Sequence, residues 1–375
     1  MTTGNSAADA RGTDEPVIGP AGRPADDEVE SAAASRGPLA MEAIAVSKDF
    51  RARHGTSIHA VRAVSFSLYR GGVVALVGES GSGKSTIARL LAGQEKLSSG
   101  SVRLDGEPVT LHTRRGFRRY KSSVQLVFQD PFSSLNPVHT VRYHIERPVR
   151  LHQRTTSAAK VGEEVASLLR QVRLVPPEQF VGKYPHELSG GQRQRVAFAR
   201  ALAARPEVLL ADEPVSMLDV SIRLEILNLL DDLRQRFQLA MLYITHDIAS
   251  ARYFADEVLV LYAGQVVERG PAEDVTQHPA HPYTQLLVAS APDPDRFGST
   301  LREGARSAAR EQAAAMTTAD GCPFSPRCPF AVDHCRTHAP ALQRIDTNRA
   351  AACWRLDVAA PDVLAGRQGG GNLTA

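Results

Sequence analysis

The chain has 375 residues, 43% of them hydrophobic, and a formal net charge of +3. This length allows one large domain or two modest ones, with an ordinary hydrophobic core. The charge is too small to indicate a nucleic-acid partner, and no run approaches the ~18 apolar residues that span a bilayer. We therefore expect a cytosolic protein whose role at a membrane, if it has one, comes through a partner.

The order of elements along the chain predicts an α/β fold. Residues 1–40 are rich in Ala, Gly, Asp, Glu and Pro and lack an apolar core, so they indicate a disordered arm and not a signal peptide. Short apolar runs with the β-branched content of buried strands follow, and helical stretches alternate with several of them. This alternation predicts a largely parallel sheet covered by helices. The runs are residues 73–77, 124–128, 208–211, 239–245 and 258–262.

Three features refine this pattern. The turn Ala263-Gly264-Gln265 joins the last run to residues 266–268 and predicts a hairpin that closes the domain. Residues 296–319, rich in Ala and Arg, predict a linker or a loose helix, and the residues after 357 predict a flexible tail. One apolar stripe at helical spacing predicts an amphipathic helix; its members are Ile226, Leu230, Leu233 and Phe237.

The segment Gly78-Glu79-Ser80-Gly81-Ser82-Gly83-Lys84-Ser85 has the spacing of a phosphate-binding loop between a strand and a helix. Its glycines allow amide groups to wrap phosphates, and the helix start adds partial positive charge. Lys84 can supply a cation to the outer phosphates, and Ser85 can supply a hydroxyl to Mg²⁺. A glycine-rich turn with a surface lysine would not explain both flanks. The expected nucleotide contacts are Gly78, Ser80, Gly81, Gly83, Lys84, Ser85 and Thr86.

Two carboxylates, Asp212 and Glu213, end the apolar run 208–211. Ligands of doubly wound sheets bind at strand ends. We expect Asp212 to hold Mg²⁺, directly or through water, and Glu213 to act as the general base that polarises the attacking water. An acidic turn is a common way to end a strand, so the phosphate loop upstream is what makes this pair informative.

Leu188-Ser189-Gly190-Gly191-Gln192 matches the signature motif of the ATP-binding subunits of ABC transporters, and the chain resembles that family over residues 41–291. The resemblance implies an ATPase with a P-loop nucleotide-binding domain of ABC type. Its mixed, mainly parallel sheet would carry a helical and an antiparallel subdomain. It also implies that Ser189, Gly190, Gly191 and Gln192 grip the γ-phosphate bound by an opposite subunit; Ser189 could equally cap a helix.

Further positions match motifs of the same family. Gln129 matches the Q-loop and implies a Mg²⁺ ligand that reports to a neighbouring domain. His246, in Ile244-Thr245-His246-Asp247, matches the switch histidine, which would contact the γ-phosphate and orient the water of Glu213. Ser216-Met217-Leu218-Asp219 resembles the D-loop, with Met217 where Ala is more usual. Phe50 resembles the aromatic that stacks on adenine, with His54 and His59 as alternatives.

The segments 129–137, 184–187 and 281–284 are similar to the oligopeptide, dipeptide and nickel importer branch. The resemblance implies two transmembrane permease subunits, a second ABC ATPase subunit (like or unlike) and, indirectly, a solute-binding protein. It places the chain peripherally on the cytoplasmic face of the cell membrane. Peptide is the expected cargo, with nickel and small oligosaccharides open. Soluble ABC ATPases of repair or translation are the rival class, but they carry long coiled-coil insertions or two cassettes.

Four cysteines lie near the C-terminus: Cys322, Cys328, Cys335 and Cys353. In a reducing compartment this clustering favours a metal over disulfides, although a Cys-x-x-Cys pair is absent. The importer branch implies a four-iron, four-sulfur (4Fe–4S) cluster here; zinc or free thiols remain alternatives. The expected organisation is an arm over 1–40, an ATPase domain over 41–291, a four-cysteine extension over 292–357 and a tail over 358–375.

Overall fold

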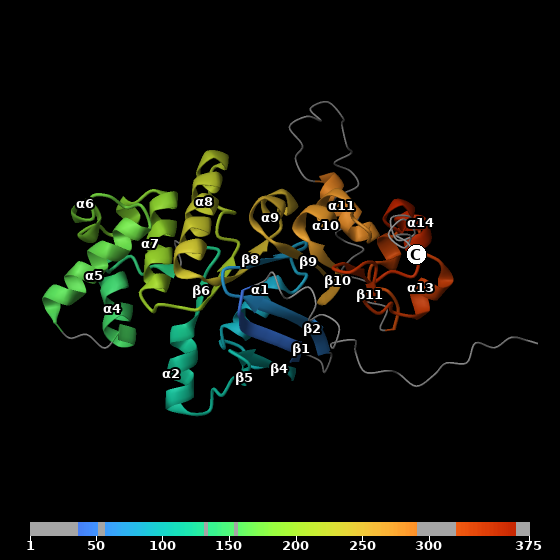
Figure 1. Cartoon of the computed structure of the whole chain (residues 1–375), viewed down its shortest axis with the longest axis horizontal. Helices are drawn as coiled ribbons and strands as arrows, with labels where there is room; N and C mark the ends of the chain where they lie inside the picture. The colour runs from blue at the N-terminus through green and yellow to red at the C-terminus, as the bar shows by residue number, and fades with distance from the viewer. Residues whose placement is uncertain (1–36, 52–56, 131–133, 154–156, 291–319, 365–375) are drawn as a thin grey trace, which may run out of the picture. The chain divides into compact units, whose positions relative to one another are not determined.

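The computed structural model describes residues 37–51, 57–130, 134–153, 157–290 and 320–364 (Figure 1). These residues all fall in one compact unit. The expected N-terminal arm up to residue 36, the expected linker over 296–319 and the last eleven residues lie outside the described part of the chain.

Five parallel strands form the centre of the main sheet, in the order β9-β3-β8-β7-β6. Every residue of β3, β7, β8 and β9 is buried. A parallel sheet covered on both faces needs such continuous apolar runs, and for that reason the sequence predicted all five strands correctly. The strands are β3 (Val73–Val77), β6 (Val124–Val127), β7 (Val208–Asp212), β8 (Ala240–Thr245) and β9 (Glu257–Tyr262).

The main sheet continues beyond β9 with antiparallel strands. β10 (Gln265–Pro271) pairs with β9, which confirms the predicted hairpin. Two two-residue strands from the C-terminal segment, β12 (Ala350–Ala351) and β11 (Gln343–Arg344), then extend the sheet from β10. The sequence did not predict this addition, because two-residue strands carry no periodicity.

A second sheet is antiparallel and has the order β2-β1-β4-β5. It confirms the antiparallel subdomain that the family resemblance implied. The register of β1 against β2 shifts at several positions, so the apolar residues do not alternate regularly. Its strands are β1 (Leu39–Arg51), β2 (Ser57–Tyr69), β4 (Ser99–Leu104) and β5 (Glu107–Pro108).

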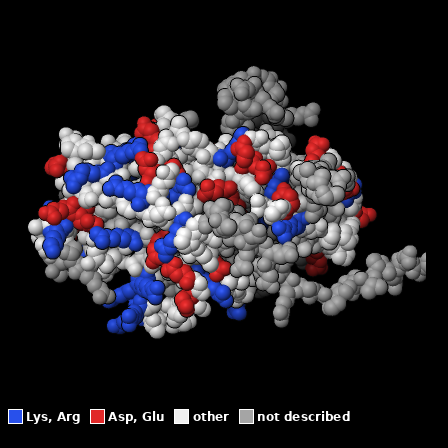
Figure 2. Space-filling view, in the orientation of Figure 1, with Lys and Arg blue, Asp and Glu red and all other residues white. Residues whose placement is uncertain are grey.

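Helices cover the main sheet, and α4, α5, α6 and α7 lie together beyond its β6 edge as the expected helical subdomain (Figure 1). Figure 2 shows basic side chains gathered over α2, on a face that otherwise mixes both signs of charge. The described α-helices are α1 (Lys84–Leu91), α2 (Arg114–Ser123), α4 (Val141–Gln153), α5 (Ala158–Gln171), α6 (Glu178–Val181), α7 (Gly190–Leu202), α8 (Val220–Phe237), α9 (Ile248–Phe254), α10 (Ala272–Gln277) and α11 (Pro282–Ser290), with α13 (Asp333–Thr337) and α14 (Leu356–Ala359) in the C-terminal segment.

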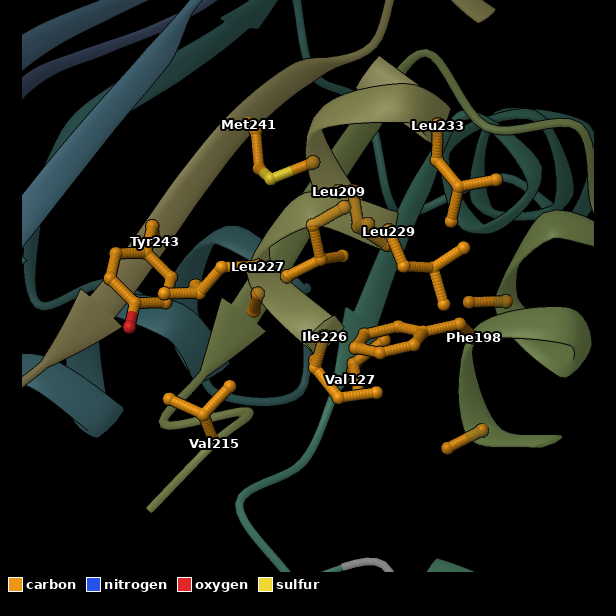
Figure 3. Packing of buried hydrophobic residues seen from close by; sticks show 14 of the residues in the cluster. Val127, Phe198, Leu209, Val215, Ile226, Leu227, Leu229, Leu233, Met241 and Tyr243 are labelled. Atoms are coloured by element: carbon orange, nitrogen blue, oxygen red, sulfur yellow. The ribbon is translucent and has the colours of Figure 1, made fainter. Parts of the chain in front are cut away.

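One buried cluster ties β6, β7 and β8 to α7 and α8 (Figure 3). Leu209 and Met241 from the sheet pack with Phe198 of α7 and Ile226 of α8 in this cluster. Three of the four residues in the expected apolar stripe of α8 are buried. The fourth, Phe237 at the helix end, is 39% exposed and does not belong to the buried cluster. Because three strands share one close-packed core, the positions of their carboxyl ends are fixed relative to one another.

The described C-terminal segment packs onto β10. A buried ion pair of 3.2 Å joins Arg349 to Glu268 of β10. We expected a tail to begin after residue 357, but the described chain continues to residue 364. Helix α14 (Leu356–Ala359) is followed by a further turn, and Leu364 packs against the small hydrophobic cluster of the C-terminal segment. Among the helices that the structure describes, none is long and apolar enough to cross a membrane.

Candidate functional site

The phosphate loop connects β3 to α1, as the motif requires. Gly83 caps α1 with a φ of 107°, and a Cβ at this position would lie 2.4 Å from the carbonyl oxygen of Ala60. Only glycine fits both constraints. The buried hydroxyl of Ser82 has no hydrogen-bond partner among the described residues. The loop is thus a backbone cradle with a spare polar atom, and this fits a phosphate group.

Lys84 is buried, and its ammonium donates hydrogen bonds to the carbonyl oxygens of Gly78 (2.7 Å) and Glu79 (2.9 Å). Burial lowers the pKa of Lys84, while the carboxylates of Glu213, Asp212 and Glu79 oppose that shift. The buried ammonium is therefore held against the backbone of the loop with its charge only partly compensated, which suits an anionic ligand.

Ser85 and Asp212 come together from α1 and the end of β7, where the Ser85 hydroxyl donates to Oδ1 of Asp212 at 3.2 Å. Burial is the main cause that raises the pKa of Asp212, and the hydrogen bond from Ser85 acts in the opposite direction. Two oxygens beside the phosphate loop provide the hard ligands that Mg²⁺ prefers.

Glu213 gathers the other two expected catalytic side chains on one oxygen. Its Oε2 accepts from Nε2 of Gln129 at 2.8 Å and lies 3.1 Å from Nδ1 of His246. These three residues follow β6, β7 and β8, whose carboxyl ends the shared core aligns. The backbone of Glu213 has a φ of 45°, a strained left-handed conformation of the kind that clusters at active sites. The Ser216 hydroxyl donates to the Glu213 carbonyl at 3.0 Å.

The signature residues form the start of α7. Ser189 is its N-cap, and a reciprocal capping box joins Ser189 to Gln192. The amides of Gly190 and Gly191 occupy the first helical positions, where no intrahelical acceptor exists. A Cβ on Gly191 would lie 2.9 Å from Ile222 of α8, so glycine also permits this close helix packing. Within the described chain, no hydrogen bond joins the signature to the phosphate loop.

Phe50 lies at the end of β1 and is 38% exposed, with the Lys48 ammonium 4.8 Å from its ring centre. It pairs with Ile58 of β2, two residues before Ala60, whose carbonyl contacts the phosphate loop. Of the two alternatives to Phe50, the ring of His59 forms a hydrogen bond with the carboxylate of Asp49, and His54 lies outside the described residues.

Sequence reasoning missed the contacts that hold the phosphate loop from the C-terminal side. The amide of Glu79 donates to the Tyr283 hydroxyl at 2.8 Å, and its carboxylate accepts from Arg327. His281 is buried, and its Nδ1 accepts the amide proton of Tyr283 at 3.0 Å. The motif at 281–284 was visible in the sequence as a resemblance, but nothing in it indicated contact with residue 79.

A groove of about 620 Å³ runs along α4, which begins twelve residues after Gln129. Arg142 and Arg150 both pair with Glu146 across one face of this helix. The groove is therefore mainly basic, with an apolar margin. Its lining residues are Thr140, Arg142, Tyr143, Glu146, Arg147, Arg150 and Leu151.

All four cysteines line one cavity of about 20 Å³, walled by Phe324, Phe330 and Trp354. This volume holds about one water molecule. Burial raises the pKa of the thiols of Cys322 and Cys328, and that of Cys353 to about 11. No three His, Cys, Asp or Glu side chains of the described residues are placed to hold a metal ion. As they lie, these residues do not fit the expected 4Fe–4S cluster.

Comparison with known proteins gives two family matches. A model described as ABC transporter matches residues 61–216, and one described as oligopeptide/dipeptide transporter, C-terminal region, matches residues 267–335. The di/tripeptide transport ATP-binding protein DppF of Pseudomonas aeruginosa is 41% identical over 79% of this chain and 90% of its own length. The oligopeptide transport ATP-binding protein AppF of Bacillus subtilis is 40% identical over 79% of this chain and 89% of its own.

Two solved structures share the fold. CbiO1 of Clostridium perfringens, part of the ABC transporter complex CbiONQ, has a TM-score of 0.56 and 28% identity over 64% of this chain and 90% of its own. A dimeric ATP-binding cassette in a post-hydrolysis state, bound to ADP and Pi, has a TM-score of 0.56 and 29% identity over 62% of this chain and 98% of its own.

Proposed function

The chain belongs to the ATP-binding subunits of ABC transporters, in their oligopeptide/dipeptide branch, and from this premise we propose that it hydrolyses ATP to drive the import of short peptides. The observation that carries the proposal is the convergence of Gln129 and His246 on one oxygen of Glu213, beside the phosphate loop. The relatives' names support peptide as the cargo. Nickel and small oligosaccharides are the alternatives.

Glu213 is the proposed general base. Its carboxylate can take a proton from a water molecule that attacks the γ-phosphate, and the 3.1 Å contact with His246 keeps the imidazole beside that water. His246 then donates to the γ-phosphate through its other ring nitrogen. The hydrogen bond from Ser216 to the Glu213 carbonyl oxygen holds the strained backbone that carries the carboxylate, so the base is positioned before substrate binds.

Ser85, Asp212 and Gln129 are the proposed ligands of Mg²⁺, which when bound would neutralise charge on the β- and γ-phosphates. Ser85 and Asp212 already lie within hydrogen-bond distance of each other. The amide nitrogen of Gln129 faces Glu213, so its amide oxygen is the atom left for the metal. Gln129 would thus connect the metal to the base.

Two cassettes are proposed to share each nucleotide. The signature offers a hydroxyl and free amides at a helix start, but these do not contact the phosphate loop of the same chain. Head-to-tail pairing with a like or unlike cassette would complete two sites, and hydrolysis would remove the phosphate that bridges them. The ring of Phe50, carried by the strand pair next to the loop, is the proposed adenine platform.

The permease partners are proposed to dock in the groove along α4. The groove follows the Q-loop residue in the chain and presents Arg142, Arg147 and Arg150 against a single carboxylate, Glu146. A permease helix with acidic and apolar side chains matches this lining. Such docking would place the chain on the cytoplasmic face of the membrane, with a solute-binding protein acting through the permeases.

The expected cluster at the cysteines does not enter this cycle, because no three metal-ligating side chains of the described residues are placed to hold a metal ion. Iron and zinc analysis of anaerobically purified protein tests the point directly. Stoichiometric iron with a visible absorption band would contradict this reading of the cysteines, and a metal-free folded protein would support it.

The Glu213→Gln variant tests the ATPase proposal. The isosteric amide cannot accept the proton, so we expect turnover to fall at least 100-fold while ATP still binds and traps a dimer on size exclusion. Glu178→Gln, at an exposed position on α6, is the matched control and should keep full turnover. Full-rate hydrolysis by the Glu213 variant would remove this residue from the role of base.

The cargo is tested in proteoliposomes that contain the permeases copurified with this chain. Addition of short peptides with a binding protein should raise ATP turnover and load peptide into the vesicles. Stimulation by nickel or oligosaccharide in place of peptide would overturn the choice of cargo and leave the ATPase proposal intact. Failure to copurify any polytopic membrane protein would contradict the importer assignment.

A further inference from the structure

Arg327 reaches the phosphate loop from the C-terminal extension. Its Nη1 and Nη2 donate to Oε2 and Oε1 of Glu79 at 2.8 and 2.9 Å, a two-point contact between residues 248 positions apart. The Arg327 side chain is only 15% exposed, while that of Glu79 is 43% exposed. Paired hydrogen bonds of a guanidinium with a carboxylate fix orientation as well as distance.

Glu79 is held from three directions at once. Arg327 binds its carboxylate, the Tyr283 hydroxyl accepts its amide proton at 2.8 Å, and Lys84 donates to its carbonyl oxygen at 2.9 Å. Because Lys84 is the cation of the phosphate loop, a shift of Glu79 would move the acceptor that orients this ammonium.

Arg327 is itself held by aromatic packing. Its guanidinium lies 5.6 Å from the ring centre of Phe324 and 5.9 Å from that of Tyr262. Tyr262 ends β9, and Phe324 is buried against both Tyr262 and Tyr283. Cys328 directly follows Arg327, so the backbone that carries the guanidinium is part of the four-cysteine segment.

We propose that Arg327 is a positioning residue of the nucleotide site, and that it sets ATP affinity by fixing Glu79 and, through it, Lys84. The four-cysteine segment then supports the nucleotide site of its own chain through Arg327, in addition to packing against β10. The inference rests on the proposed ATPase function and extends it to residues that lie outside the ATPase domain as the sequence delimits it.

The test measures binding of fluorescent ATP and ADP analogues, together with KM and kcat, in the full-length chain. Arg327→Gln should weaken nucleotide binding and raise the KM for ATP about tenfold, with kcat within twofold of the parent. Glu79→Gln should have the same effect, and the double variant should be no weaker than either single variant, because both changes remove one contact. Arg327→Lys, which keeps the charge but not the paired geometry, should lie between.

Arg336→Gln is the matched control, an exposed arginine of the same segment with a long contact of 3.9 Å to Asp333. It should leave KM unchanged. A merely structural role would lower kcat through a smaller folded fraction and leave KM alone. Parental nucleotide affinity in Arg327→Gln, or additive losses in the double variant, would overturn the inference. If Arg327→Gln does not fold, Glu79→Gln decides alone. None of these results touches the ATPase proposal, which fails only if the parent does not hydrolyse ATP.

Discussion

The side-chain amide of Gln129 donates a 2.8 Å hydrogen bond to the carboxylate of Glu213, although the two residues follow different strands of the main sheet. The adjacent, parallel pairing of β6 with β7 brings their carboxyl ends side by side. The proposed metal ligand and the proposed base are therefore in direct contact, and a change at one should be felt at the other.

Gln129→Glu should move the pH dependence of turnover. A second carboxylate within hydrogen-bond distance of Glu213 would place two like charges side by side, which is unfavourable when both are ionised. We expect the acidic limb of kcat against pH to shift upward by about one pH unit or more. The profile is measured from pH 5.5 to 9.

Gln179→Glu, at an exposed position on α6, serves as the control for this variant and should leave the profile unchanged. An unshifted acidic limb in Gln129→Glu would show that the two side chains do not meet in the working enzyme.

Asp212→Asn should weaken Mg²⁺ binding and leave nucleotide binding largely intact. The amide keeps the size of the side chain and loses the charge that would attract Mg²⁺, so the half-saturating Mg²⁺ concentration should rise at least tenfold. Binding of nucleotide in the presence of a chelator should change little. Asp232→Asn, at an exposed carboxylate of α8, is the control; an unchanged Mg²⁺ dependence in Asp212→Asn would assign the metal to other ligands.

Ser189→Asp and Ser189→Asn separate the two roles of the signature serine. Both residues are good helix N-caps, so neither should lower the stability of α7 appreciably. Only Asp adds a negative charge where the γ-phosphate of the opposite subunit is proposed to bind. In a Glu213→Gln background, we expect the Asp variant to lose ATP-dependent dimers on size exclusion and the Asn variant to retain them. Equal behaviour of the two would argue that Ser189 acts as a cap alone.

His281 should make the protein less stable in mild acid. Burial lowers its pKa from 6.5 to about 4, although a hydrogen bond to the backbone of Ala352 acts in the opposite direction. In the folded chain, Nδ1 of the ring accepts the Tyr283 amide proton. Below pH 6.5, His281 becomes protonated in the unfolded chain but stays neutral in the folded chain. The contribution of His281 to the free energy of unfolding is therefore complete above pH 6.5 and is lost as the pH falls towards 4. The full loss is about 3 kcal/mol in the free energy of unfolding.

Denaturant titrations at pH 7.5, 6 and 5 measure this loss. His281→Gln should be less stable at pH 7.5 but should show a smaller fall in the free energy of unfolding between pH 7.5 and 5 than the parent. His112→Gln, at an exposed position, should fall as the parent does. The same pH slope in His281→Gln and in the parent would exclude this residue as the source.

The main sheet could be predicted from the sequence because strands buried on both faces must be apolar at every position, as in Val73–Val77. The sequence did not predict β1 and β2, because their pairing shifts register between Ala43 and Val46. This shift breaks the alternation of apolar and polar residues that marks a half-buried strand. The gathering of Gln129, Glu213 and His246 was implied by the order of family motifs. The hydrogen bonds between them follow from the sheet topology, which no local pattern reveals.

The support from the C-terminal side could not have been predicted. Glu79 lies in the phosphate loop at a position for which the motif specifies no residue type, and Arg327 lies in a proline-rich segment 248 residues later. Nothing in the spacing of either residue indicates the other. The buried ion pair of Glu268 and Arg349 could not have been predicted either. Charged residues are rarely buried without a partner, and the sequence does not identify the partner.

The pairing of β12 with β10 has a consequence for edge-to-edge aggregation of this protein. It covers backbone groups of β10 that would otherwise form an open edge, and a bare edge is a template for another copy to add a strand. The new outermost strand, β11, has only two residues, both polar and exposed, Gln343 and Arg344. A chain cut before residue 320 would lose this blunt, charged margin, and it should be prone to aggregation even if its catalytic half folded normally.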